Sequence, residues 1–116
     1  MVRKIEGPTR IPVPGGKLID EHVGRVNSGD EQVSIAHMTA PPGWAEPAQT
    51  PSFTEYTVVL RGSVLVEHDG GTVEIAAGQS VVTSPGERVR YSAGPDGAEY
   101  VAVCLPAFAP EAAGRD

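Results

Sequence analysis

Short runs in which apolar and polar residues alternate recur along most of the chain, and Gly or Pro separates them. In segment 88–91, Val89 and Tyr91 lie on one side of an extended chain, and Arg88 and Arg90 lie on the other. This two-residue period is that of a half-buried strand. We expect strands at 18–26, 32–38, 53–60, 63–68, 72–76, 80–83, 88–91 and 99–105. A series of eight to ten such short strands is typical of an antiparallel sandwich or small barrel.

Turn residues punctuate these runs and predict where the chain reverses. The polar stretch 27–30 separates the first two strands, and 69–71 (Asp-Gly-Gly) is a strong hairpin signal. Residues 61–62 predict a bend, and 94–97 (Gly-Pro-Asp-Gly) predicts a further turn before the last strand.

The two ends differ in character from the centre. Residues 1–17 contain three prolines and the pair Gly15-Gly16. We expect an extended arm that pairs only along a sheet edge, because proline lacks a backbone donor. The Ala-rich segment 107–116 is expected to be a flexible tail. The folded domain is expected at 18–106.

Composition supports strands and excludes several classes of function. The aliphatic residues are 15 Val and 5 Ile against 4 Leu, and β-branched side chains favour strands over helices. The net charge of −6 disfavours nucleic-acid binding. No apolar run is long enough for a membrane span or a signal peptide, so we expect a cytoplasmic protein without a membrane partner. One cysteine, Cys104, allows no internal disulfide.

Four glycines and one glutamate keep the spacing of two known motifs. Gly43, Glu55 and Gly62 fit the first motif of the cupin family, and Gly78 and Gly86 fit the second. The chain therefore resembles a small single-domain cupin over roughly 32–108. The stretch 56–78 is most similar to the ethanolamine-utilisation branch. The resemblance implies an all-β, jelly-roll-type antiparallel β-barrel.

The chain departs from the family at the positions that hold a metal. Metal-binding cupins use three histidines and one glutamate, and the histidine positions here carry Gln49, Pro51 and Val89. Two oxygen donors, from Gln49 and Glu55, do not hold a transition metal firmly. We therefore expect no usual cupin metal. A divalent metal on an atypical set is the alternative, with the candidate ligands His37, Glu46, Gln49 and Glu55.

Glu55 is the leading candidate for catalysis. The resemblance implies that its side chain points into the barrel, where apolar surroundings would raise the carboxyl pKa and suit it to acid–base work. The alternative is a structural glutamate bonded to nearby backbone. Gln49 is a candidate for substrate contact, and Tyr91 shares a face with Val89, so its hydroxyl is expected inside.

Three further residues are candidates for binding a substrate: Trp44, Glu46 and His37. Trp44 would close the cavity over a ligand or only hold its loop in place, and Glu46 would line the cavity or be solvated. Strand alternation leaves open whether His37 or its neighbours Ala36 and Met38 face inward. Cys104 is expected to be a packed core residue, with lining of the pocket as the alternative.

These observations lead to three hypotheses of function. In the first, the chain is an isomerase, lyase or cyclase without a redox cofactor, in which Glu55 is the acid–base group for a small polar or carbonyl-containing metabolite. In the second, it is a non-catalytic binding or sensor module. In the third, it is a metal-dependent cupin. The resemblance also implies a homodimer that exchanges its N-terminal arms.

Overall fold

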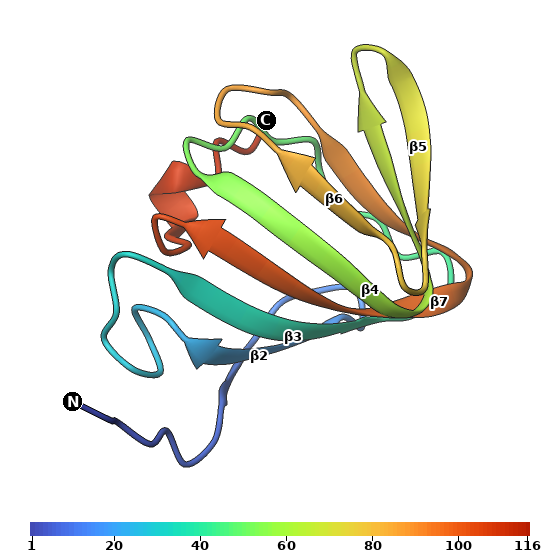
Figure 1. Cartoon of the computed structure of the whole chain (residues 1–116). Helices are drawn as coiled ribbons and strands as arrows, with labels where there is room; N and C mark the ends of the chain where they lie inside the picture. The colour runs from blue at the N-terminus through green and yellow to red at the C-terminus, as the bar shows by residue number, and fades with distance from the viewer.

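The computed structural model describes all residues, 1–116, and consists of seven strands and one 3-10 helix (Figure 1). The strands are β1 (Thr9–Ile11), β2 (Leu18–Val23), β3 (Ser34–Ala40), β4 (Thr54–His68), β5 (Gly71–Ala76), β6 (Ser80–Thr83) and β7 (Arg90–Leu105), and the helix is η1 (Pro110–Ala112). The helix is far too short to cross a membrane, and no other helix is present. The predicted all-β architecture is confirmed.

The strands form one antiparallel sheet whose order is β1-β2-β3-β7-β4-β5. β4 is long enough to pair with β7 along its length and with two strands on its other edge. Its first part pairs with β6, and its second part pairs with β5. Figure 1 shows the sheet curling so that β2 and β3 lie at one end and the β5 hairpin at the other. The hollow of this curl contains the core.

The predicted turn at 94–97 is wrong, because β7 continues through it. The β4–β7 register passes from Gly62↔Ala98 to Val64↔Ala93, so residues 94–97 bulge out opposite a single residue, Ser63. Gly62 and Gly97 adopt positive φ angles of 72° and 76°. The glycine-rich segments at 61–62 and 94–97 therefore bend two paired strands together, which curls the sheet.

Other predictions of strands agree with the structure more closely. β6 has the predicted bounds, and the hairpin closes with His68 opposite Gly71. The strand expected at 88–91 begins later, at Arg90, and is the start of β7. Val89 lies just before it and pairs through both backbone groups with Gln49.

That pairing closes one side of the barrel. Segment 44–49, which the sequence presents as a loop, bonds to the beginning of β7: the amide of Glu46 donates to the carbonyl of Tyr91 (3.2 Å) and that of Ala93 to the carbonyl of Trp44 (2.8 Å). The main core cluster is Ala40, Trp44, Val59, Val64, Val66, Ile75, Val89, Tyr91, Ala93, Ala98 and Tyr100. The closing segment thus covers one side of this core.

The C-terminal segment differs from the expected flexible tail. Ala107, Ala109 and Ala113 are buried. The amides of Thr50 and Ser52 donate to carbonyls of the segment at 2.8 and 2.9 Å. Small alanine side chains let the segment lie flat on the barrel, which local sequence patterns do not reveal. The N-terminal arm does pair along an edge, through β1 with β2 of the same chain.

Candidate functional site

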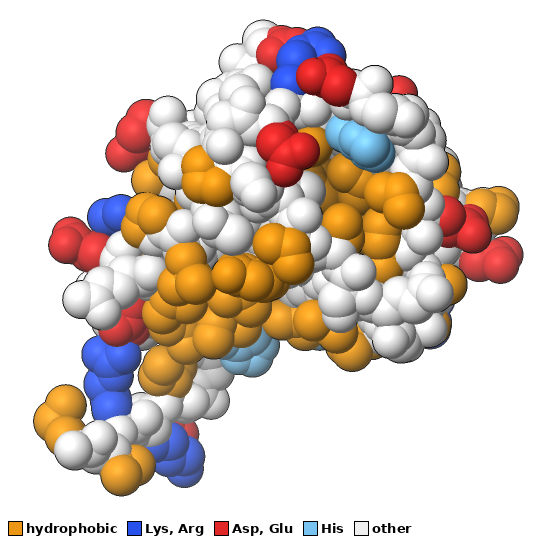
Figure 2. Space-filling model, turned by 45° about the horizontal axis from the view of Figure 1, so that its top comes forward, with side chains coloured by type: hydrophobic (Ala, Val, Ile, Leu, Met, Phe, Trp, Pro, Cys, Tyr) orange, Lys and Arg blue, Asp and Glu red, His pale blue; other side chains and the backbone are white.

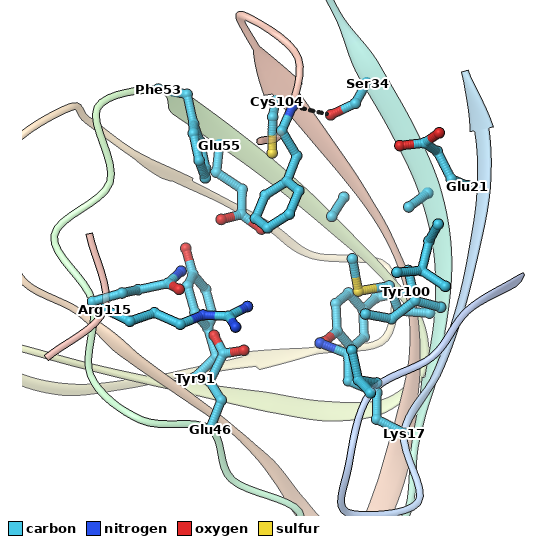
Figure 3. A pocket seen from close by; sticks show the side chains of 18 residues that line it. Lys17, Glu21, Ser34, Glu46, Phe53, Glu55, Tyr91, Tyr100, Cys104 and Arg115 are labelled. Atoms are coloured by element: carbon cyan, nitrogen blue, oxygen red, sulfur yellow. Dashed lines mark hydrogen bonds between the residues drawn. The ribbon is translucent and has the colours of Figure 1, made fainter. Parts of the chain in front are cut away.

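A cavity of about 110 Å³ lies inside the curled sheet, between β2, β3 and β7 on one side and the closing segment 44–49 on the other. Its volume holds several water molecules or part of a small organic molecule. The polar groups that line it are mainly Lys17, Glu46, Gln49, Glu55, Tyr91 and Arg115. Figure 3 shows the side chains of Lys17, Glu46, Glu55, Tyr91 and Arg115 converging from separate elements on one space.

Glu55 projects into the cavity from β4. Its neighbour Tyr56 is 40% exposed on the outer face, as strand alternation requires. Burial, and then the nearby charge of Glu46, raises the pKa of the Glu55 carboxyl to about 7, against the opposing effects of Lys17 and Tyr91. This carboxyl therefore gains and loses its proton near neutral pH.

The closing segment contributes two lining residues. Gln49 is 5% exposed, and its backbone bonds to Val89 in both directions, at 2.9 and 2.8 Å. Burial also raises the pKa of Glu46, which the charges of Lys17 and Arg115 partly counter. Both residues were candidates from the sequence, and the structure places both in the cavity.

Tyr91 also faces the cavity, in agreement with the alternation around Val89. Its hydroxyl shares a hydrogen bond of 2.9 Å with the Thr83 hydroxyl. Burial, and then the charge of Glu55, raises the Tyr91 pKa, so the phenol stays protonated at neutral pH. Cys104 lines the cavity as well, and burial raises the pKa of its thiol to about 12, which makes it unreactive as a thiolate.

Lys17 is a lining residue that sequence reasoning missed. It follows the glycine pair of the arm and is only 8% exposed. Its ammonium lies 4.1 Å from the ring centroid of Trp44 and 5.4 Å from that of Tyr100. Burial lowers its pKa, against the charges of Glu46 and Glu55. No local pattern identifies it, because the two rings come from distant parts of the chain.

Arg115 was missed for a similar reason. It belongs to the C-terminal segment, which backbone bonds hold against residues 48–52, and it forms an isolated bridge with Gln49. Although the residue is exposed, its side chain reaches the cavity (Figure 3). Two cations and three carboxyl groups, those of Glu21, Glu46 and Glu55, thus line the same cavity.

Two of the sequence candidates lie elsewhere. His37 points away from the cavity, and its Nε2 lies 2.7 Å from a carboxylate oxygen of Glu99. Its neighbours Ala36 and Met38 line the cavity instead, which settles the question that strand alternation left open. Trp44 is buried behind Lys17 and supports it rather than covering the opening.

The residues present do not fit a transition metal of the usual cupin kind. No group of three or more His, Cys, Asp and Glu side chains in the structure is arranged to hold a metal ion. His37, the only imidazole in the atypical set, is on the opposite face of its strand and bonded to Glu99. Val89, at a former histidine position, is a core residue without a donor.

Solved structures confirm the cupin barrel. An oxalate decarboxylase variant from Bacillus subtilis superposes with a TM-score of 0.80 at 18% identity, covering 96% of this chain and 31% of that one. An RmlC-like cupin from Shewanella frigidimarina gives 0.74 at 16% identity, covering 86% and 85%. Ethanolamine utilization protein Q from Salmonella typhimurium gives 0.67 at 21% identity, covering 79% and 71%. At such identities the likeness shows the fold alone.

Sequence comparison gives one curated relative and one family. The chain is 43% identical over 104 residues to endoribonuclease YbeY of Myxococcus xanthus, covering 89% of this chain but 35% of that protein. It therefore spans about a third of that relative's length. The family model described as the AraC-binding-like domain matches residues 1–115. Because this match takes in nearly every residue of the barrel and its arm, the chain belongs to the AraC-binding-like domain family.

Proposed function

We propose that the barrel cavity binds a small polar organic molecule that carries a carbonyl group, and that Glu55 exchanges a proton with it. The observation that carries this proposal is a carboxyl with a pKa of about 7 facing a cavity lined by other polar groups. A group that titrates near neutral pH is suited both to take a proton and to return it.

The surrounding residues supply the other parts of such a site. The amide of Gln49 offers a donor and an acceptor to a substrate, and the protonated Tyr91 hydroxyl offers a donor to a carbonyl oxygen. A proton removed from carbon next to that carbonyl would go to Glu55 and return at another position. This transfer is an isomerisation; lyase and cyclase reactions can begin with the same proton removal and then lose a leaving group or close a ring, and none of these steps needs a redox cofactor.

Binding without turnover is the second candidate function. The observation in its favour is the matched family, whose description is that of a binding domain. In this case the same cavity binds the molecule without changing it, and the protonation state of Glu55 depends on whether the molecule is bound. Catalysis and recognition share the binding step, so one experiment addresses both.

The name of the curated relative does not suggest a function for this chain. The net charge is −6, and several exposed arginines are paired with acidic residues, including Arg10 with Asp20 (2.9 Å) and Arg90 with Glu67 (2.9 Å). Figure 2 shows basic side chains scattered over this face, several beside acidic ones, rather than gathered in a patch. Such a surface does not favour the phosphate backbone of RNA.

A homodimer and a cytoplasmic location remain proposals. Support for a dimer comes from the outer face of β4, where Tyr56, Val58 and Leu60 are 40%, 40% and 51% exposed. Val82, which pairs with Tyr56 from β6, is 54% exposed. Figure 2 shows hydrophobic side chains gathered on the surface of the molecule. A row of apolar residues on a sheet face is typical of an interface between protein chains.

The test is a screen of small carbonyl compounds by chemical-shift mapping on isotope-labelled protein. We expect shifts at Gln49, Glu55 and Tyr91, and loss of turnover or altered affinity in Glu55→Gln. Glu74→Gln, on the exposed β5 hairpin, removes a carboxylate outside the cavity and serves as the control. Shifts confined to the outer face of the sheet, or full function in Glu55→Gln, would overturn the proposal.

A further inference from the structure

We propose that the molecule bound in this cavity is a small carboxylate, whose charged end is held by the ammonium of Lys17 together with the guanidinium of Arg115. This inference rests on the proposed function, since it assumes that the cavity is a binding site. It goes beyond it by naming the chemical class of the ligand and the two residues that select it.

Lys17 is a buried residue whose ammonium has no ion-pair partner in the protein. It is 8% exposed and forms none of the ion pairs in the structure, which all lie within 4.0 Å, and none of the side-chain hydrogen bonds. Its ammonium contacts only the faces of Trp44 and Tyr100 on one side. Because Lys17 lines the cavity, its ammonium N–H donors are available to an acceptor that enters it.

The rings of Trp44 and Tyr100 favour the protonated form of Lys17 at this position. An ammonium over an aromatic face is held by electrostatic attraction, which favours the protonated form. With Trp44 and Tyr100 behind it, the nitrogen of Lys17 is directed toward the centre of the cavity, where Figure 3 also shows Arg115. Two cations on one space make an anion the matching ligand.

Acidic side chains line the same cavity as Lys17 and Arg115. Glu21, on β2, already accepts backbone bonds from Val26 (3.0 Å) and Asn27 (2.7 Å), so it shapes the wall. With Glu46 and Glu55, three carboxyl groups line the cavity against the two cations. Glu55 is the one that loses its charge near neutral pH. With Glu55 protonated, the two remaining carboxylates match the two cations in number, so an entering carboxylate meets less repulsion than at higher pH.

The apolar part of the cavity wall indicates the chemistry of the uncharged end of the ligand. The apolar residues of the lining are Ile11, Val13, Ile19, Met38, Phe53 and Phe108 among others. Phe53 and Phe108 pack edge to face, with ring centroids 5.8 Å apart. A carboxylate with a short apolar body therefore satisfies both the cations and the hydrocarbon wall.

The experiment measures the affinity of paired probes at pH 6, where Glu55 is mostly protonated. The carboxylates acetate, butyrate and hexanoate are each compared with the primary amide of the same length. Trp44 is the sole tryptophan and touches Lys17, so its fluorescence reports binding directly. The proteins are the wild type, Lys17→Met, Lys17→Arg and, as the matched control, Lys4→Met in the exposed arm.

We expect carboxylates to bind the wild type more tightly than the amides. Lys17→Met should weaken carboxylate binding by roughly 30-fold and leave amide binding nearly unchanged. Lys17→Arg should retain most of the carboxylate affinity, and Lys4→Met all of it. Circular dichroism of each variant identifies any that fail to fold, and the preference of the wild type for carboxylates over amides can be measured without any variant.

Three results would overturn the inference, and they separate it from the proposed function. Equal binding of amides and carboxylates, or an unchanged carboxylate affinity in Lys17→Met, would leave the cavity a binding site but remove the carboxylate as its ligand class. If Lys17→Met does not fold, the comparison of carboxylates with amides on the wild type decides the ligand class. If neither class of probe binds and the carbonyl screen also fails, both proposals are overturned.

Discussion

Gly62 and Gly97 meet across β4 and β7 so closely that a Cβ atom on Gly62 would overlap the carbonyl oxygen of Gly97. Both residues have positive φ angles, 72° and 76°. The contact lies where β7 bulges by four residues and both strands bend together. The shape of the barrel, and hence of the cavity, depends on the absence of a side chain at this point.

Substitution of Gly62 by Ala should destabilise the fold strongly, because the methyl group has no space and the backbone angle is unfavourable. We expect a loss of about 3 kcal/mol or more in the free energy of unfolding, measured by chemical denaturation. Gly78→Ala is the matched control: its φ is 86°, but nothing lies within 4 Å of the added carbon. It should lose only about 1–2 kcal/mol. Equal losses would contradict the close contact.

Thr57 and Thr83 form a second matched pair, since both are buried threonines. The Thr57 hydroxyl has no hydrogen-bond partner, whereas that of Thr83 bonds to Tyr91 at 2.9 Å. Thr57→Val should therefore stabilise the protein by roughly 1 kcal/mol, because it removes an unsatisfied buried group. Thr83→Val should destabilise it by about 1–2 kcal/mol, because it removes the hydrogen bond between the threonine and tyrosine hydroxyls. Thermal unfolding of both variants decides the matter, and the same sign for both would refute this reading.

The stability of the protein should depend on the ionisation of Glu55. Its pKa is about 7 in the folded protein, against an ordinary value of 4.5. A raised carboxyl pKa means that the folded state holds the proton more tightly than the unfolded state does. Stability is therefore present in full below about pH 4.5 and is lost as the pH rises from there through about 7. The loss amounts to roughly 3 kcal/mol.

Glu55→Gln removes this titration and tests it directly. Relative to the wild type, the variant should gain stability progressively between pH 5 and pH 7 and hold a constant advantage above that range. Glu74→Gln, with its side chain on the exposed β5 hairpin, controls for the general effect of removing a charge. Parallel stability curves for the wild type and Glu55→Gln would show that the cavity does not perturb this carboxyl.

The outer face of β4 should join two copies of the chain. Light scattering at micromolar concentration should give the mass of a dimer, and Val58→Asp should convert it to a monomer by placing a charge in the apolar row. Val26→Asp is the control, because Val26 is 64% exposed in the loop after β2 and outside the proposed interface. A wild-type monomer, or a dimer that survives Val58→Asp, would contradict the proposed interface.

Local patterns in the sequence predict much of this fold. β6 and the hairpin at 69–70 follow from alternation and turn residues alone, as does the inward side of Val89 and Tyr91. The bulge at 94–97 could not be predicted in this way, because Gly-Pro-Asp-Gly has the composition of a turn in any context. Only its pairing with β4, through contacts with Gly62, makes it a bulge within one strand.

The candidate site is less accessible to sequence reasoning. Glu55, Gln49 and Tyr91 were found because motif spacing and alternation fix the direction of their side chains. Lys17 and Arg115 were not, since each reaches the cavity through contacts made far away in the chain. Trp44 holds Lys17, and backbone bonds to 48–52 hold the segment of Arg115. His37 was misjudged because alternation alone cannot choose between the two faces of β3.

The central claim is that this cavity holds a carboxyl that keeps its proton close to neutral pH, and direct titration of Glu55 tests it best. Carbon-13 NMR of the side-chain carboxyl, assigned by comparison with Glu55→Gln, gives the midpoint without reference to any ligand. We expect the titration of the Glu55 carboxyl to have a midpoint of about 7. A midpoint at the ordinary value of 4.5 would contradict it.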